Sequence, residues 1–338
     1  MTAEFWRMGA TPVPLSRVAD RARALEADGW DGLAVGEAHG VLPDPYVTLA
    51  ACAAATTTLK LGTAVSVPLR STLLAADAMA TVQTLSGGRA RFCFGRGGGG
   101  PKIVPHWPIP VDEFEAYLRD VQALLRREGI DVWGREVRMS LLDELDPSLR
   151  RPRPPVDVAI TGSRTLDVAA AHADGLTFSV GANVDALAHA ARRGRAAWAS
   201  AARDVSTLSL GCFVQVAVTT SQDGRARRAI EGLVMTHSHF SSPRESPLVV
   251  RARSSAPSEA PSAPEERGEV EFYAHDADIE ERIDSFAIAG EPEYCAQRLG
   301  EIVDLGFERI YLGTRGVGVD VDEDNTSRVA REVLSRLR

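Results

Sequence analysis

Segments with helical spacing alternate with extended segments along almost the whole chain, and this alternation restricts the possible folds more than any other feature. Apolar residues fall at Leu15, Val18, Ala22 and Leu25, as in an amphipathic helix, whereas 59–67 is the nearly continuous apolar run of a buried parallel strand. The predicted strands are 5–10, 32–35, 59–67, 90–94, 156–160, 176–180, 208–218 and 309–312. The predicted helices are 14–28, 45–56, 73–85, 111–127, 165–173, 184–202, 225–235 and 291–305.

Strands that alternate with helices form parallel sheets, because a helix returns the chain to the edge from which the next strand starts. A closed barrel of 338 residues can form one domain. We therefore predict a protein of the α/β class with a single (β/α)8 TIM barrel over residues 1–338. A doubly wound open sheet is the alternative.

Two segments interrupt the alternation. Residues 95–110 form a Gly/Pro-rich loop after the fourth predicted strand. Residues 241–268 are rich in Ser, Pro, Ala, Glu and Arg and hold few large apolar side chains, so they cannot bury enough surface to offset the entropy lost on ordering. We predict a mobile insertion there, either a lid near the site or a tolerated surface loop.

Charge and composition exclude several classes of protein. A net charge of −8 does not suit a general nucleic-acid binder, which needs a basic surface against phosphates. The chain has no run of about 18 apolar residues that would predict a membrane span, and residues 1–9 lack the pattern of a signal peptide. The cysteines lack CxxC spacing, which predicts reduced core residues of a cytoplasmic protein and no zinc site: Cys52, Cys93, Cys212 and Cys295.

Five segments, taken together and in their order along the chain, resemble the luciferase-like flavin-dependent oxidoreductase family. They are LEADGWDGLAVGEAH at 25–39, LGTAVSVPLR at 61–70, TLSGGRARFCFG at 84–95, GSRTLDVAAAHADG at 162–175 and the segment 290–312. Each is loose by itself, but together they span nearly the whole sequence. The resemblance implies a barrel, usually a homodimer, with the cofactor at the carboxyl ends of the strands, where barrel enzymes place their chemistry.

The start of the helix after strand 156–160 is a candidate anion site. Free N–H groups and the helix dipole favour an anion there, and Gly162 allows its close approach. The hydroxyl groups of Ser163 and Thr165 and the charge of Arg164 can add contacts. The resemblance assigns this segment to the cofactor phosphate, and the alternative is an ordinary helix cap.

The resemblance also places the cofactor ring at the end of the third strand. In deazaflavin-dependent relatives a bulge with a non-prolyl cis peptide backs the ring, so Ser66–Val67 is the predicted cis bond and a cofactor contact. The alternative is a plain strand end at Pro68. Gly95 and Gly97 follow the fourth strand, where glycines let the backbone pass close to a cofactor or serve as a loop hinge.

Glu37 and His39 are the candidate acid–base pair at the end of the second strand. Residues two apart on a strand share a face, and a carboxylate can tune an imidazole that exchanges a proton near neutral pH. The alternative is a polar pair that supports the barrel mouth. Many relatives carry the histidine directly after the acid, where this chain has Ala38.

Three functions fit these observations. The first is an oxidoreductase that uses coenzyme F420 and transfers a hydride between this deazaflavin and a small-molecule or natural-product substrate, with reduction of a C=C or C=N bond as the expected reaction. A peptide is a further candidate substrate. The alternatives are an FMN-dependent monooxygenase and a non-catalytic flavin-binding barrel. The segments 66–68 and 162–166 resemble the deazaflavin branch more closely, which favours F420.

Overall fold

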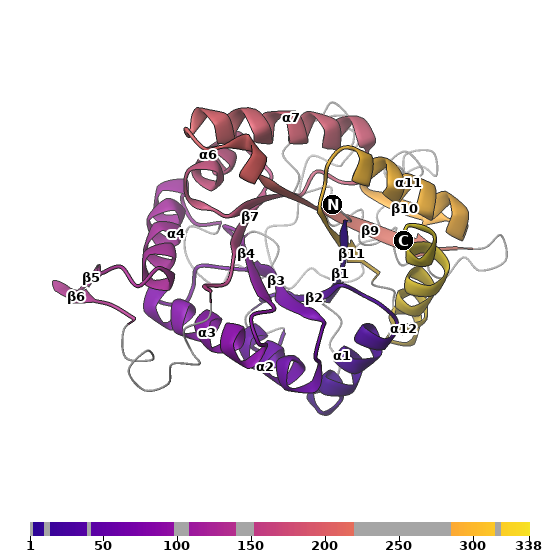
Figure 1. Cartoon of the computed structure of the whole chain (residues 1–338), viewed down its shortest axis with the longest axis horizontal. Helices are drawn as coiled ribbons and strands as arrows, with labels where there is room; N and C mark the ends of the chain where they lie inside the picture. The colour runs from indigo at the N-terminus through magenta and orange to yellow at the C-terminus, as the bar shows by residue number, and fades with distance from the viewer. Residues whose placement is uncertain are drawn as a thin grey trace, which may run out of the picture.

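Eight parallel strands close into a barrel that is surrounded by helices in the computed structural model of the chain (Figure 1). The structure describes residues 3–9, 14–38, 42–97, 108–139, 152–219, 285–314 and 319–338. The strands follow the order β1–β2–β3–β4–β7–β8–β9–β11, and β11 pairs with β1. This closure confirms the predicted (β/α)8 barrel and excludes the open sheet.

The described elements lie within a few residues of the predicted bounds. The barrel strands are β1 (Glu4–Gly9), β2 (Gly32–Val35), β3 (Lys60–Ser66), β4 (Ala90–Phe94), β7 (Val156–Ile160), β8 (Gly175–Phe178), β9 (Ser209–Val218) and β11 (Arg309–Gly313). The helices are α1 (Val18–Ala27), α2 (Pro45–Ala55), α3 (Thr72–Leu85), α4 (Val111–Leu125), α6 (Ser163–His172), α7 (Val184–Ser200), α11 (Pro292–Asp304) and α12 (Val319–Arg328). The predicted helix 225–235 and the predicted insertion 241–268 lie outside the described residues.

Some elements have no counterpart among the predictions. A hairpin of β5 (Ile130–Val132) and β6 (Arg135–Val137) follows α4. Its strands are too short to show the alternation of apolar and polar residues that predicts a strand. Strand β10 (Ala287–Gly290) pairs with the last residues of β9. Helix α12 has a mainly polar sequence and was missed because its apolar anchor comes only in the following turn, Val329–Val333. None of the described helices has the length and apolar character needed to cross a membrane.

The inside of the barrel is packed with side chains rather than open. Trp6 on β1 packs against Tyr311 on β11 in a tilted arrangement with ring centroids 5.5 Å apart, and the Phe213 ring centroid lies 5.2 Å from that of the same tyrosine. Gly32 makes room for this cluster, because a Cβ there would lie 2.4 Å from the Trp6 ring.

The four cysteines are buried and form no disulfide bond, as predicted.

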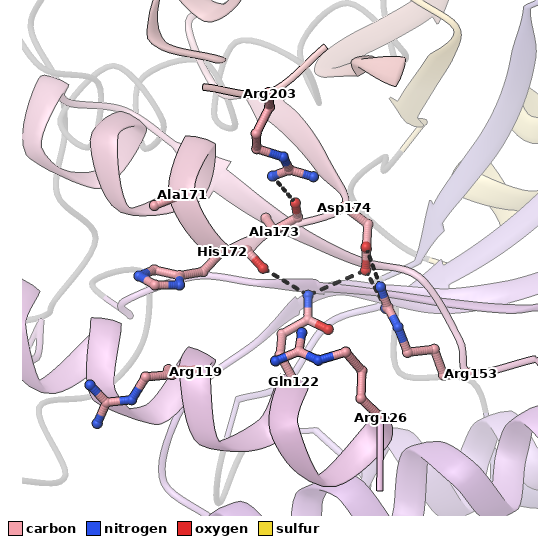
Figure 2. A pocket seen from close by; sticks show the side chains of 9 residues that line it. All are labelled: Arg119, Gln122, Arg126, Arg153, Ala171, His172, Ala173, Asp174 and Arg203. Carbon is pink, nitrogen blue, oxygen red and sulfur yellow. Dashed lines mark hydrogen bonds and ion pairs between the residues drawn. The ribbon is translucent and has the colours of Figure 1, made fainter. Parts of the chain in front are cut away.

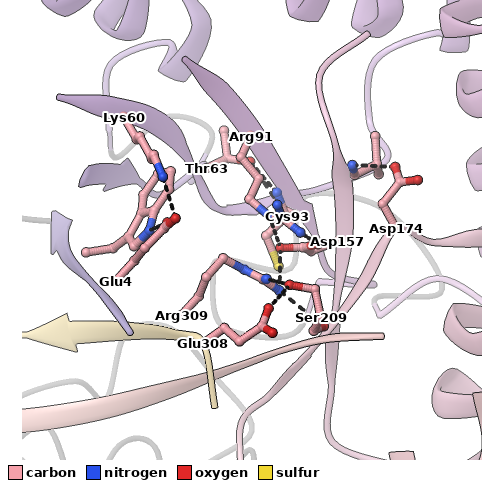
Figure 3. Close-up of polar contacts among 12 residues, drawn as sticks. Glu4, Lys60, Thr63, Arg91, Cys93, Asp157, Asp174, Ser209, Glu308 and Arg309 are labelled. Atoms are coloured by element: carbon pink, nitrogen blue, oxygen red, sulfur yellow. Dashed lines mark hydrogen bonds and ion pairs between the residues drawn. The ribbon is translucent and has the colours of Figure 1, made fainter. Parts of the chain in front are cut away.

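A buried ionic layer fills the barrel near the amino ends of the strands (Figure 3). Asp157 accepts hydrogen bonds from Arg91 Nε and Nη2 at 2.7 and 2.8 Å and pairs with Arg309 Nη2 at 3.2 Å. The side chain of Asp157 is fully buried, and that of Arg309 nearly so. A Cβ on Gly175 would lie 2.4 Å from Asp157 Oδ1, so only glycine leaves space for the layer. The layer seals this end of the barrel and leaves the carboxyl end for a site.

Glu26 holds the segment that enters β3. Its Oε1 accepts hydrogen bonds from the backbone N–H groups of Thr57, Thr58 and Leu59 at 2.8, 2.6 and 2.9 Å. Partial burial alone would raise the pKa of Glu26, but these N–H groups favour the carboxylate and lower its pKa to about 2. The hydrogen bonds therefore depend on an ionised Glu26.

This arrangement predicts a pH-dependent contribution to stability. Because the pKa of Glu26 in the folded protein lies below its ordinary value of 4.5, the stabilisation is complete above about pH 4.5 and is lost as the pH falls towards 2. We expect Glu26→Gln to be less stable than the wild type near about pH 6, and the difference to shrink near about pH 3. Urea unfolding at both pH values measures it, and a difference that does not change with pH would contradict the prediction.

Candidate functional site

The candidate residues come together at the carboxyl edge of four neighbouring strands. Glu37 follows β2, Ser66 ends β3, Gly95 follows β4, and Gly162 lies between β7 and α6. These strands are consecutive in the barrel, and the register pairs Ser66 with Phe94 and Phe94 with Val158. His39 lies outside the described residues.

The inner face at this end forms an apolar floor. Met8, Ala64 and Phe213 pack against the Trp6–Tyr311 cluster and remain partly exposed, in contrast to the buried layers below them. Ala159 on β7 is also partly exposed. A floor of small and apolar side chains that water reaches is suited to a flat aromatic ligand.

The bulge at the end of β3 lies earlier than predicted. The non-prolyl cis peptide joins Ala64 and Val65, so its prediction at Ser66–Val67 was wrong. The pairing register with β4 shifts between Ala64 and Ser66. Ser66 resumes regular pairing, since its carbonyl accepts a hydrogen bond from Gly95 N at 2.9 Å, and the irregularity must therefore precede it.

This shift changes which side chain faces the site. Ser66 and Val67 are only 0% and 5% exposed, and the hydroxyl group of Ser66 lies 3.1 Å from that of Tyr46 on α2, away from the barrel interior. Val65, which the sequence reasoning missed, is partly exposed, and a Cβ on Gly95 would lie 2.9 Å from its Cγ2. Contacts of Ser66 and Val67 with a ligand would have to involve their backbone.

Glu37 is bound to the bulge by both its backbone and its side chain. Its N–H donates to the Val65 carbonyl at 3.1 Å, and its Oε2 accepts from Val67 N at 2.9 Å. Its Oε1 accepts from Arg70 Nε at 3.2 Å, and the side chain is 2% exposed. Arg70 also pairs with Asp44, the residue that caps α2. The carboxylate thus supports the backbone of the bulge.

The start of α6 has the features of an anion site. Gly162 is its N-cap and provides no side-chain cap, while Ser163 and Arg164 are exposed and Thr165 is buried. A Cβ placed on Gly162 would have no atom within 4 Å. The space beside Gly162 is therefore open, and free N–H groups at a helix start favour a negatively charged ligand.

Arg96 is a second cation at this place, and the sequence reasoning passed over it in favour of the adjacent glycines. Its Nε donates to the Ile109 carbonyl at 2.8 Å. Burial and the nearby guanidinium group of Arg164 both lower the pKa of Arg96. Within the described ranges neither arginine forms an ion pair. Two nearby like charges that have no acidic partner in the described part of the chain favour a bound anion. Gly97, with φ +88°, gives the turn after Arg96 its left-handed conformation.

A pocket of about 230 Å³ lies at the opposite end of the barrel, where α6 leads into β8 (Figure 2). It is lined by Arg119, Arg126, Arg153 and Arg203, among others. Arg203 donates to two carbonyl groups at the end of α6 at 2.6 and 3.0 Å, and Gln122 donates to the His172 carbonyl at 2.9 Å. Arg153 pairs with Asp174 through two hydrogen bonds of 2.6 Å. Cations gather there to satisfy a helix C-terminus, which explains the pocket without a ligand.

Comparisons with known proteins agree with this architecture. The 5,10-methylenetetrahydromethanopterin reductase of Methanolobus tindarius is 21% identical over 306 residues, which are 89% of this chain and 91% of that protein. The coenzyme F420-dependent tetrahydromethanopterin reductase of Methanopyrus kandleri has a similar structure, with a TM-score of 0.74 at 18% identity over 100% of both chains. A monooxygenase from Streptomyces bottropensis gives a TM-score of 0.69 at 18% identity over 99% of this chain and 100% of that one.

The sequence profile of one family covers most of the chain. The profile of the luciferase-like monooxygenases matches residues 1–309, which include all the strand ends described above except the last. The similar structures show the fold at these low identities, and the profile shows the family. The chain belongs to the luciferase-like monooxygenase family.

Proposed function

We propose that this protein is an F420-dependent oxidoreductase that transfers a hydride between the deazaflavin and a small-molecule or natural-product substrate. The observation that carries the proposal is the anion site made by Arg96, Arg164 and the first turn of α6 beside an apolar floor. Coenzyme F420 combines a flat ring with a phosphodiester and a carboxylate-bearing tail. Two arginines that have no acidic partner among the described residues suit a ligand with more than one negative group.

The residues at the strand ends fit such a cofactor. Gly162, Ser163 and Thr165 would hold its phosphate together with the two arginines, and the open space beside Gly162 leaves room for it. Val65 and Gly95 would face its ring. The bound cofactor would supply the hydride chemistry, and the protein would orient the substrate and manage a proton. Reduction of a C=C or C=N bond is the proposed direction.

An FMN-dependent monooxygenase is the second candidate, because the same helix start would bind the single phosphate of FMN. The similar monooxygenase from Streptomyces bottropensis supports this alternative. Titration of the purified protein with F420 and with FMN, followed by fluorescence quenching, tests both. Tight binding of F420 alone supports the proposal. Tight binding of FMN alone refutes it and directs attention to oxygen-dependent turnover, and binding of neither refutes both.

His39 is the proposed proton-handling residue, since the carboxylate of Glu37 is committed to the bulge. We expect His39→Ala to lower turnover while the affinity for the cofactor stays within about twofold of the wild type, because the imidazole would act on the substrate. Steady-state kinetics with saturating substrate, beside a cofactor titration, measure both quantities. Unchanged turnover would exclude this role for His39.

A second copy of the chain is the proposed partner of the outer face of α2 and α3. Helix α2 contains no charged residue, and α3 contains only Asp77, whose pKa is raised by burial. Val47, Leu74 and Leu85 on this face are 70%, 62% and 53% exposed, and the two helices pack side by side (Figure 1). A largely apolar face of this kind, with Asp77 as the one charged residue of the two helices, marks an interaction site.

We therefore expect a homodimer that Leu74→Glu converts to a monomer, because the substitution would bury a charge in an apolar interface. Light scattering coupled to gel filtration measures the mass. Trp133→Glu is the control, since Trp133 is 98% exposed on the hairpin β5–β6, away from this face. A wild-type protein that elutes as a monomer would contradict the dimer.

A further inference from the structure

We propose that Glu37 and Arg70 are positioning residues that fix the bulge of β3 on which the cofactor ring lies, and that Glu37 does not supply a proton. This inference rests on the proposed function. It concerns the group that we name the bulge clamp, which consists of Glu37, Asp44, Tyr46 and Arg70 behind the bulge.

The contacts of Glu37 enclose the partly exposed residue of the bulge. Its backbone N–H binds the carbonyl group of Val65, and its carboxylate binds the N–H group of Val67, at 3.1 and 2.9 Å. The backbone on both sides of the Val65 side chain is therefore fixed by a single residue. Movement of Glu37 would move the surface that faces the site.

The carboxylate is poorly placed to exchange a proton with a substrate. Each oxygen accepts a hydrogen bond, from Val67 N and from Arg70 Nε, and the side chain is 2% exposed. A catalytic acid or base must come within hydrogen-bond reach of the reacting group. A buried carboxylate with both oxygens occupied suits support of the backbone instead.

Arg70 is itself held in place, which makes the clamp rigid. Its Nη2 donates to Asp44, and its guanidinium group lies 5.0 Å from the centre of the Tyr46 ring. Burial raises the pKa of Tyr46, so its phenol stays neutral and shares a hydrogen bond with Ser66 at the end of the bulge. The clamp therefore connects β2, α2 and both ends of the bulge through charged and aromatic contacts.

Glu26 on α1 provides a matched control, because its carboxylate also binds backbone N–H groups of the β3 segment. It binds the backbone where β3 begins, as Glu37 binds it where β3 ends, and it is remote from the carboxyl edge. A substitution of either residue by glutamine removes one negative charge and weakens hydrogen bonds to backbone N–H groups. Only the substitution of Glu37 should affect the site.

The experiment compares Glu37→Gln, Arg70→Lys and Glu26→Gln with the wild type in three measurements. Amide hydrogen exchange of cofactor-free protein reports on residues 63–69. Fluorescence titration gives the Kd for F420, and turnover against pH gives the profile of kcat. We expect faster exchange at 63–69 and a Kd for F420 raised about tenfold in Glu37→Gln, because hydrogen bonds to a charged carboxylate are weakened. The pH profile should keep its shape.

Arg70→Lys should show a smaller change in the same direction, since an ammonium group keeps the charge but cannot bridge Glu37 and Asp44 as a guanidinium group does. Glu26→Gln should match the wild type in Kd. A pH profile that loses one limb in Glu37→Gln, with Kd unchanged, would make Glu37 a proton donor and overturn the inference. Unchanged exchange and Kd in both clamp variants would also overturn it.

The failure of the inference differs from the failure of the proposed function. Wild-type protein that binds F420, with clamp variants that bind it equally well, refutes the inference alone. Wild-type protein that binds no F420 refutes the proposed function and the role of the clamp towards the ring. In that case, faster exchange at 63–69 would still show that Glu37 holds the backbone of β3.

Discussion

Replacement of Asp157 by alanine should lower the free energy of unfolding by about 3–5 kcal/mol, because it leaves the buried Arg309 and the partly buried Arg91 without their shared counter-ion. The carboxylate is fully buried and receives hydrogen bonds on both oxygens. The loss of both bonds therefore adds to the cost of the uncompensated charges. Urea unfolding monitored by circular dichroism measures the effect, provided that the transition is two-state.

Asp20→Ala is the control for this substitution. Asp20 also pairs with an arginine, Arg23, but on the surface of α1, where the side chains are 74% and 57% exposed. Its loss should change the free energy of unfolding by less than about 1 kcal/mol. Asp157→Asn, which keeps the volume, serves if the alanine variant does not fold. If both Asp157 variants remained as stable as Asp20→Ala, the ionic layer would not be holding the barrel together.

Removal of both cations at the start of α6 should weaken the binding of F420 by about 100-fold or more. A hydrogen bond to a charged group contributes about 1.5–3 kcal/mol, and the variant Arg96→Gln/Arg164→Gln removes two such donors from the proposed phosphate site. The remaining N–H groups of α6 would retain part of the affinity. Fluorescence titration measures the Kd, and wild-type affinity should fall as salt is added, since the site is partly exposed.

The double variant Arg119→Gln/Arg126→Gln controls for the change in net charge. It also removes two positive charges, but from the pocket at the amino end of the barrel, where α6 ends. Its Kd for F420 should equal that of the wild type. An equal loss of affinity in both double variants would assign the effect to overall charge. A Kd unchanged in Arg96→Gln/Arg164→Gln would exclude the proposed phosphate site.

The barrel could be predicted from the sequence because most of its strands and helices show their own spacing of apolar residues. The apolar run 59–67 and the apolar spacing in 14–28 reflect which faces of this strand and this helix are buried. Such patterns can be recognised within a short stretch of sequence. Helix α12 was missed for the converse reason: its sequence is mainly polar, and it is held to the barrel by hydrogen bonds of the buried Asn325 and by the apolar turn that follows it. This helix is therefore stabilised by tertiary packing that its own hydrophobic pattern does not predict.

The site could be predicted only to the level of strand ends. The segment of the bulge was recognised, but one irregular residue shifts the register, so that Val65 and not Val67 faces the site. No sequence motif marks Arg96, because its proposed role in binding an anion depends on Arg164, which is distant in sequence and nearby in the fold. The burial of Glu37 between Val67 and Arg70 is likewise a property of packing.

The ionic layer also limits which parts of such a barrel can change when it acquires a new substrate. At the amino end, a Cβ at Gly175 would lie too close to Asp157, so substitution in this layer is strongly restricted. Towards the carboxyl end, Met8 and Phe213 are only partly buried, so substitution there should cost less in folding than in the ionic layer. The amino end of the barrel thus tolerates few substitutions, whereas residues at the carboxyl end can change without loss of the fold.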